Sequence, residues 1–285
     1  MSSYADLRNP VGTHVPVGKG MVTDMLARAT AIGAEALQVF VGNPRGWALS
    51  PGDPSKDRAF RDACAASGMR IIVHTPYLVN LGSPTESTYR SSVATVAHNL
   101  RRAVEIGAEG VVVHTGSCVD DGYLDRAMRQ VREGLLPLLD AVADEGPWLL
   151  LEPTAGQGRS LCAGVGDLAT YLANLDHHPR AGICLDTCHF FAAGAPLDEP
   201  GGTTATVDLL REAGPLRLVH ANDSKEPRGS MHDRHAALGT GHIGIAAFEE
   251  LLAHPAMDGV PLILETPGSR ELGDPQIGLL KKLRP

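Results

Sequence analysis

One pattern recurs along this chain and strongly limits what it can fold into. A short, almost continuously apolar run ends in a polar residue, a loop rich in Gly, Pro and Ser follows, and a longer stretch with helical periodicity comes next. Continuous apolar runs are typical of parallel strands that are covered on both faces. The pattern occurs eight times, and the predicted strands are residues 11–15, 36–41, 70–74, 110–114, 148–152, 181–186, 216–220 and 261–265.

The stretches between these runs are predicted to be amphipathic helices. Within residues 87–106, Val93, Val96, Leu100 and Val104 are three or four residues apart, so they share one face of a helix. Residues 83–86 read Ser-Pro-Thr-Glu, which predicts a capping box with proline at the first helical position. The other predicted helices are residues 21–32, 57–66, 123–142, 165–175, 206–213, 245–253 and 276–283.

Eight such alternations predict an α/β fold, a single (β/α)8 TIM barrel that takes in residues 1–285 as one domain. Hydrophobic residues make up 43% of the chain and aromatic residues only 4%, so aliphatic side chains must fill the core. The alternative is an open doubly wound sheet, which usually has a Gly-rich phosphate loop after its first strand. Residues 14–20 match neither form of that loop, so the barrel is favoured.

Composition excludes several classes of protein. The net charge of −8 disfavours a protein that coats nucleic acid without specificity. The five cysteines form no CxxC pair, the first residues lack a signal-peptide pattern, and no apolar run approaches the length of a membrane span. We therefore expect a cytoplasmic protein, and a monomer, because no exposed apolar helix face stands out.

Polar residues end six consecutive predicted strands. In a TIM barrel these ends meet at the mouth, where catalytic groups lie. Three imidazoles and three carboxylates packed together need cations to offset repulsion and desolvation, and mixed nitrogen and oxygen ligands suit Zn²⁺, with Mn²⁺ or Fe²⁺ as alternatives. The residues are His74, His114, Glu152, Asp186, His220 and Glu265.

Three further residues extend this predicted cluster. His189 lies three positions after Asp186, at the start of the following helix or turn. Asp233 and His235 lie in the loop after the seventh strand, and an Asp-x-His triplet allows both side chains to reach one ion. Together the three predict another metal site, whereas Cys184 and Cys188 are interpreted as packing residues.

Several motifs, taken in order, resemble those of the endonuclease IV family of apurinic/apyrimidinic endonucleases. The resemblance runs from residues 12–15 to residues 265–267 and is carried by stretches 40–47, 77–82, 152–158, 186–189 and 233–235. It implies three zinc ions, with Mn²⁺ or Fe²⁺ as alternatives at one or more sites. The implied ligand sets are His74, His114 and Glu152; Glu152, Asp186, His220 and Glu265; and His189, Asp233 and His235.

The resemblance also implies an activity. A hydroxide between the first two ions is the expected nucleophile, and Glu152, which joins these ions, is the expected catalytic residue. The family hydrolyses the phosphodiester 5′ to abasic sites in double-stranded DNA, leaves a 3′-hydroxyl for base excision repair, and trims blocked 3′ ends. By resemblance, DNA would be contacted by Arg45, Trp47, Tyr77 and Leu78.

Two positions depart from the family pattern, Pro153 and, in the stretch 239–244, His242. Pro153 follows Glu152 where the family usually has Asn, so a hydrogen bond from a side-chain amide is expected to be missing.

Two other functions fit parts of the sequence. Sugar isomerases and epimerases have a similar barrel and similar metal ligands, but they use one or two metals and a pair of proton-transferring groups. A third metal site has no purpose in that chemistry, so His189, Asp233 and His235 discriminate against it. A metal-storing or DNA-binding scaffold with a decayed site would be expected to have lost a ligand, and none of the nine is lost.

Overall fold

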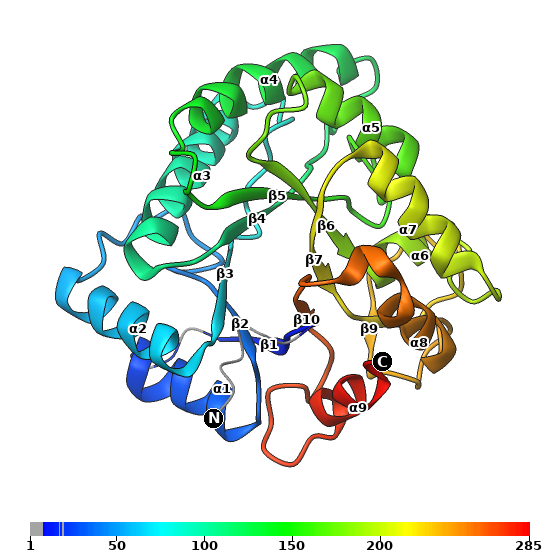
Figure 1. Ribbon diagram of the computed structural model, residues 1–285. Helices are drawn as coiled ribbons and strands as arrows, with labels where there is room; N and C mark the ends of the chain where they lie inside the picture. The colour runs from blue at the N-terminus through cyan, green and yellow to red at the C-terminus, as the bar shows by residue number, and fades with distance from the viewer. Residues whose placement is uncertain (1–7, 17, 19) are drawn as a thin grey trace.

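The computed structural model describes residues 8–16, 18 and 20–285. Eight parallel strands close into a barrel in the order β1-β10-β7-β6-β5-β4-β3-β2 (Figure 1). The predicted (β/α)8 fold is therefore confirmed. The strands are β1 Val11–Val15, β2 Ala36–Val39, β3 Arg70–His74, β4 Gly110–His114, β5 Trp148–Glu152, β6 Ala181–Asp186, β7 Leu216–His220 and β10 Leu262–Leu264.

Helices form a ring around the strands (Figure 1). Among the described residues, no helix is long and apolar enough to cross a membrane. Residues 1–7, on which the expectation of no signal peptide rests, lie outside the described part. The helical segments are η2 Met21–Leu26, α1 Ala27–Ala31, α2 Pro54–Ser67, α3 Glu86–Ile106, α4 Leu124–Asp140, α5 Val165–Asn174, α6 Thr187–Ala192, α7 Gly202–Ala213, α8 Ile245–Ala253, η3 Pro255–Met257 and α9 Gln276–Leu283.

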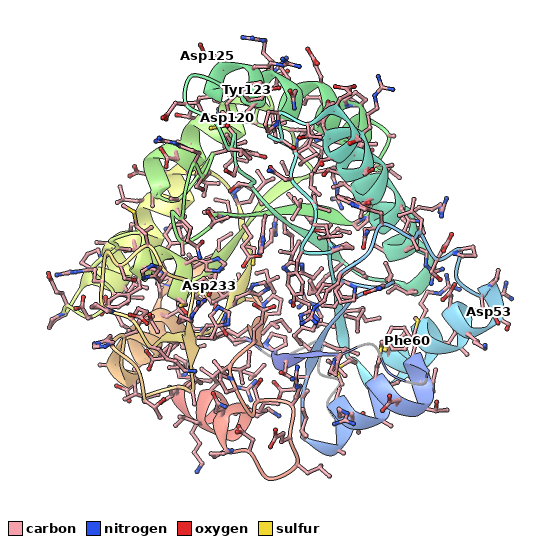
Figure 2. All side chains as sticks on the ribbon, turned by 180° about the vertical axis from the view of Figure 1, so that it is seen from behind. Asp53, Phe60, Asp120, Tyr123, Asp125 and Asp233 are labelled. Atoms are coloured by element: carbon pink, nitrogen blue, oxygen red, sulfur yellow. The ribbon has the colours of Figure 1, made fainter. Side chains whose placement is uncertain are left out.

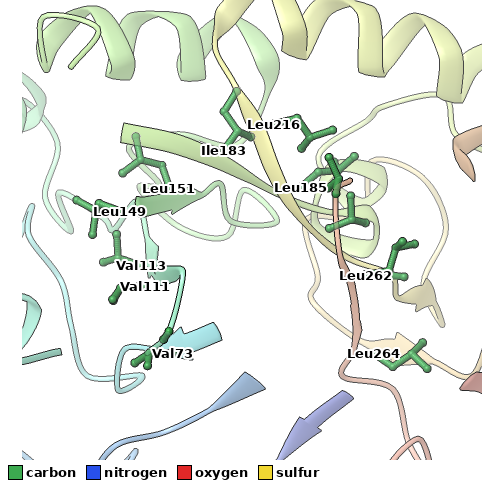
Figure 3. Packing of buried hydrophobic residues seen from close by; sticks show 14 of the residues in the cluster. Val73, Val111, Val113, Leu149, Leu151, Ile183, Leu185, Leu216, Leu262 and Leu264 are labelled. Atoms are coloured by element: carbon green, nitrogen blue, oxygen red, sulfur yellow. The ribbon is translucent and has the colours of Figure 1, made fainter. Parts of the chain in front are cut away.

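The two faces of the strands bury two separate apolar clusters, because side chains alternate along a strand. The larger cluster joins the strands to the helices, and Figure 3 shows part of it, with Val111, Val113, Leu149 and Leu151 on β4 and β5. The smaller cluster lies inside the barrel and takes one residue from each of seven strands. We call it the apolar layer; it consists of Ala36, Ile72, Val112, Leu150, Cys184, Leu218 and Ile263.

The eighth strand, β1, contributes a glycine at the same level. Gly12 pairs with Ala36 in the barrel sheet. A Cβ atom on Gly12 would lie 1.7 Å from the carbonyl oxygen of Ala36, which no backbone can accommodate without moving. The close approach of β1 and β2 therefore requires glycine here.

The capping box predicted before α3 is wrong. The helix begins at Glu86 after Thr85, and Thr85 makes no side-chain capping bond. The Ser83 hydroxyl instead accepts a hydrogen bond from the backbone N–H of Thr85, two residues on, and Glu86 pairs with Arg90. A short polar turn has thus replaced the predicted cap, because Ser83 finds a nearer donor.

Two short elements near the barrel mouth escaped prediction. Helix α6 follows β6 directly, so the connection to β7 contains two helices rather than one. After β7, the chain forms a small antiparallel hairpin of β8 Asp223–Ser224 and β9 His235–Ala236. Both elements carry residues of the predicted metal cluster.

Candidate metal centre

The candidate ligands lie one level above the apolar layer. Each residue of that layer is followed two positions later by a polar residue, which must point to the same inner face of the barrel. Glu152 thus follows Leu150, and His74 follows Ile72. The same step adds Gln38, which follows Ala36, and a step from Gly12 adds His14; neither is a predicted ligand. The complete polar level is His14, Gln38, His74, His114, Glu152, Asp186, His220 and Glu265.

The first predicted set converges on one oxygen of Glu152. Its Oε2 atom lies 3.3 Å from Nε2 of His74 and 3.2 Å from Nε2 of His114. Glu152 and His74 are buried, whereas the His114 side chain is 31% exposed and faces the pocket. All three ligand atoms lie within 4.8 Å of one another, so one ion could bind them together.

The second predicted set shares Glu152 with the first. Nδ1 of His220 lies 2.9 Å from Oε1 of Glu152, 3.4 Å from Oε2 of Glu265 and 3.9 Å from Oδ2 of Asp186. These four residues again offer ligand atoms within 4.8 Å of one another. Because Glu152 uses one oxygen for each set, it can bridge two ions.

The third predicted set depends on the two short elements at the mouth. Asp186 is the N-cap of α6 and accepts a hydrogen bond from the backbone N–H of His189, which fixes His189 one turn into the helix. Asp233 and His235 come from the hairpin β8-β9, and Asp233 lies within the ring of helices (Figure 2). Its carboxylate is 3.3 Å from Nε2 of His189 and 3.0 Å from Nε2 of His235.

The donor set and its spacing fit a divalent metal. Two ligands on a tetrahedral zinc ion at about 2.0–2.1 Å are about 3.3 Å apart. The pairs formed by His74 and His114 with Glu152, and by His189 with Asp233, lie 3.2 to 3.3 Å apart. Nε2 of His235 is buried without a hydrogen-bond partner, although a carboxylate faces it.

Hydrogen bonds to carbonyl groups orient two of these imidazoles. Nδ1 of His74 donates to the carbonyl of Thr75 at 2.7 Å, and Nδ1 of His189 donates to that of Pro153 at 3.0 Å. A neutral ring that donates from Nδ1 has its lone pair on Nε2, which here faces a carboxylate. The lone pair of each Nε2 atom thus faces the lone pairs of a carboxylate oxygen, so a proton or a metal ion is required between the two atoms.

The electrostatics of the metal-free site show the same requirement. Burial favours neutral imidazole, but Asp186 and Asp233 raise the pKa of His189 to about 9. Burial likewise opposes ionisation of Glu152, yet His220 and His114 hold the pKa of this carboxyl well below its usual range. The cluster therefore retains protons on its imidazoles unless a cation replaces them.

The two neighbouring cysteines behave differently. Cys184 and Cys188 are both buried, and each has candidate ligands nearby. Burial raises the pKa of each thiol to about 12, so both are neutral thiols in this setting. This agrees with their interpretation as packing residues.

A pocket of about 540 Å³ lies above the cluster, and its lining includes Arg45 and Tyr77. The Tyr77 side chain is 58% exposed. Trp47 and Leu78, the other two predicted DNA-contact residues, are each 37% exposed on the same two loops but do not line this pocket. The structure thus brings two of the four predicted DNA-contact residues to the mouth of the candidate site.

Known proteins resemble this chain over almost its whole length. The family described as xylose isomerase-like TIM barrels matches residues 26–283. A protein named "Probable endonuclease 4" from Streptomyces coelicolor is 53% identical over 99% of this chain and 98% of its own length. The chain belongs to the endonuclease IV family. The crystal structure of endonuclease IV from Thermus thermophilus superposes with a TM-score of 0.82 at 35% identity and covers 96% of this chain and 98% of its own.

The barrel alone is shared more widely than the endonuclease IV family. A D-tagatose 3-epimerase-like protein superposes with a TM-score of 0.72 at 20% identity and covers 96% of both chains. At that identity the likeness concerns the fold and carries no information about the reaction.

Three residues of this endonuclease IV family member that escaped sequence analysis belong to the site. Gln38 bonds to several members of the polar level, and Arg270 lines the same pocket as Arg45. Asn222 donates to Oδ2 of Asp186 at 2.8 Å and accepts from the backbone N–H of Glu265. A polar residue within an apolar run was the available signal for Gln38, whereas Asn222 and Arg270 lie in loops without a pattern.

Proposed function

We propose that this endonuclease IV family member hydrolyses the phosphodiester 5′ to abasic sites in double-stranded DNA and leaves a 3′-hydroxyl, as a zinc-dependent enzyme of base excision repair. We also propose that it trims blocked 3′ ends. The observation that carries the proposal is the presence of three linked ligand sets in one cluster. Relatives named endonuclease 4 support the same reaction.

Each ligand set would hold one ion. His74 and His114 would hold the first ion with Glu152, which would join it to the second, and the hairpin β8-β9 would hold the third over the mouth. Bound there, the ions would supply an activated water and neutralise charge on the phosphate. The apolar layer beneath keeps water from reaching the cluster from below. The protein's own part is to fix these positions before the substrate arrives.

Two arginines at the mouth suit a DNA backbone. Arg45 and Arg270 both line the pocket and are exposed, and neither has a carboxylate partner among the described residues. The chain as a whole carries a net charge of −8, so attraction for phosphate has to be local. Tyr77, which lines the same pocket and is exposed, offers a ring for stacking on a base next to the lesion.

One chain offers all nine candidate ligands, which supports the proposal of a monomer. We expect a monomer that acts in the cytoplasm.

The decisive experiment presents one protein with both candidate reactions. Metal-loaded and chelator-stripped protein are incubated with a duplex that contains a tetrahydrofuran abasic analogue, with an undamaged duplex, with a duplex blocked by a 3′-phosphate and, separately, with a ketose. We expect incision and trimming only by the loaded protein, and the incised end should support extension by a DNA polymerase. Intact abasic DNA together with interconversion of a ketose and its epimer would replace the proposal with the sugar-epimerase reading.

A further inference from the structure

The side chain of Gln38 lies at the centre of the polar level and is fully buried. Its amide nitrogen is 2.7 Å from Oε1 of Glu265 and 2.9 Å from Nδ1 of His14. Its amide oxygen is 2.8 Å from Nε2 of His220. Both N–H groups and the carbonyl of this one side chain are therefore used within the candidate metal centre.

These contacts determine which way the amide points. The amide nitrogen of Gln38 lies against an oxygen of the Glu265 carboxyl group, which accepts a hydrogen bond from it, so the NH₂ group faces Glu265. The Gln38 oxygen then faces His220, whose Nε2–H must donate to it. Nδ1 of His220 is left with its lone pair directed at the second ligand set, 2.9 Å from Glu152.

His220 differs in this respect from the other histidines of the cluster. His74, His114, His189 and His235 all face the carboxylates with Nε2. For His74 and His189, a backbone carbonyl accepts from the opposite nitrogen and fixes the tautomer. His220 is turned the other way, and the group that accepts from its opposite nitrogen is the side chain of Gln38.

We propose that Gln38 is a positioning residue for the second metal set. It fixes the tautomer of His220 that presents Nδ1 to a divalent cation, and it holds Glu265 in the orientation that completes the same set. The inference rests on the proposed use of metal ions. A ligand held in one tautomer and one orientation binds a cation without first losing that freedom, and loss of such a partner typically weakens binding about 10–100-fold.

The first test compares two buried glutamines. Gln38→Met removes the amide with little change in volume. Gln130→Met is the matched control, because Gln130 is also buried and bonded, to Ser83 and Tyr123, but lies on α4 away from the cluster. Dissociation constants for Zn²⁺ and Co²⁺ are measured by competition with a chelator. We expect one of the ions to bind about 10–100-fold more weakly in Gln38→Met, and the Co²⁺ absorption bands to change, with no effect in the control.

Unchanged metal affinities and unchanged Co²⁺ spectra in Gln38→Met would overturn the proposal. Circular dichroism of both variants shows whether a loss of metal binding reflects unfolding. A zinc-loaded wild-type protein tests the same point without any substitution, since nitrogen-15 NMR of the histidine rings distinguishes protonated from metal-bound nitrogens. We expect His220 to be protonated at Nε2 and bound through Nδ1, the reverse of His74 and His189.

The outcome is separable from that for the proposed function. Protein that binds zinc through Nδ1 of His220 but leaves abasic DNA intact would contradict the proposed reaction and support the role of Gln38. Binding through Nε2 of His220, or no ion at this set in the wild type, would refute the role of Gln38 whatever the DNA assay shows.

Discussion

Replacement of Glu152 by glutamine should remove two ions with a single atom change. Oε2 of Glu152 faces His74 and His114, whereas Oε1 faces His220, so the carboxylate belongs to two of the three ligand sets. Glutamine keeps the shape but has one neutral oxygen, and its NH₂ group cannot bind a cation. This oxygen can face only one set, so one set loses a ligand outright and the other exchanges a charged ligand for a neutral one.

The number of ions lost follows from the sharing of Glu152 between two ligand sets. We expect the metal content of Glu152→Gln to fall from three ions per chain to one, because only the set of His189, Asp233 and His235 lacks Glu152. Loss of a two-ion clamp should slow incision by at least about 1000-fold, which corresponds to about 4 kcal/mol. Metal analysis after dialysis and single-turnover incision of tetrahydrofuran-containing duplex measure the two quantities.

Asp233→Asn is the informative comparison. It alters one set only, so this variant should retain two ions per chain. The reasoning fails if Glu152→Gln retains two or more ions, or if Asp233→Asn loses as many as Glu152→Gln does.

Three further predictions concern stability. Gly12→Ala should lower the free energy of unfolding by about 3 kcal/mol, because the added Cβ would strike a backbone oxygen of β2. Gly164→Ala is the control and should have little effect, because the space around Gly164 is open. Urea unfolding measures both variants. Asp57→Ala should cost about 3 kcal/mol by leaving the buried Arg102 guanidinium without its bidentate partner, and an unchanged urea midpoint would contradict this. In the presence of a chelator, burial opposes the charged form of His189, but the neighbouring aspartates raise its pKa to about 9. The stability that this charge contributes is therefore complete below the usual histidine pKa of 6.5 and is lost as the pH rises through 9. A thermal midpoint that stays constant over this pH window would refute the raised pKa of His189.

Sequence reasoning succeeded where one physical rule acts on every strand. Strands β4 and β5 are apolar until they reach the barrel mouth, so the first polar residue marks the end of each, at His114 and Glu152. The alternation of side chains then decides which of these residues share the inner face. Because six strands end in a polar residue, periodicity alone predicts the candidate cluster.

Reasoning from the sequence failed where neighbouring groups compete for the same atom. Ser83 was expected to cap α3, but its hydroxyl bonds to the nearer N–H of Thr85. Gln38 was interpreted only as part of an apolar strand. Its amide is buried, and because a buried amide without hydrogen bonds costs free energy, its burial implies that it has hydrogen-bond partners. Those partners come from β1, β7 and the residue after β10, and no local pattern connects these segments.

The order in which the strands are joined has a consequence for biosynthesis. Glu265 follows the last strand of the barrel, β10, which pairs with β1 and β7 and closes the sheet. When a ribosome has made the chain only as far as β7, His74, His114 and Glu152 have been synthesised. Glu265 and the strand that closes the barrel have not. Since chains emerge from the N-terminus onward, the complete centre can form only after all eight strands of the barrel have left the exit tunnel. Metal binding at the second set would thus distinguish chains with a closed barrel from nascent chains whose barrel is still open.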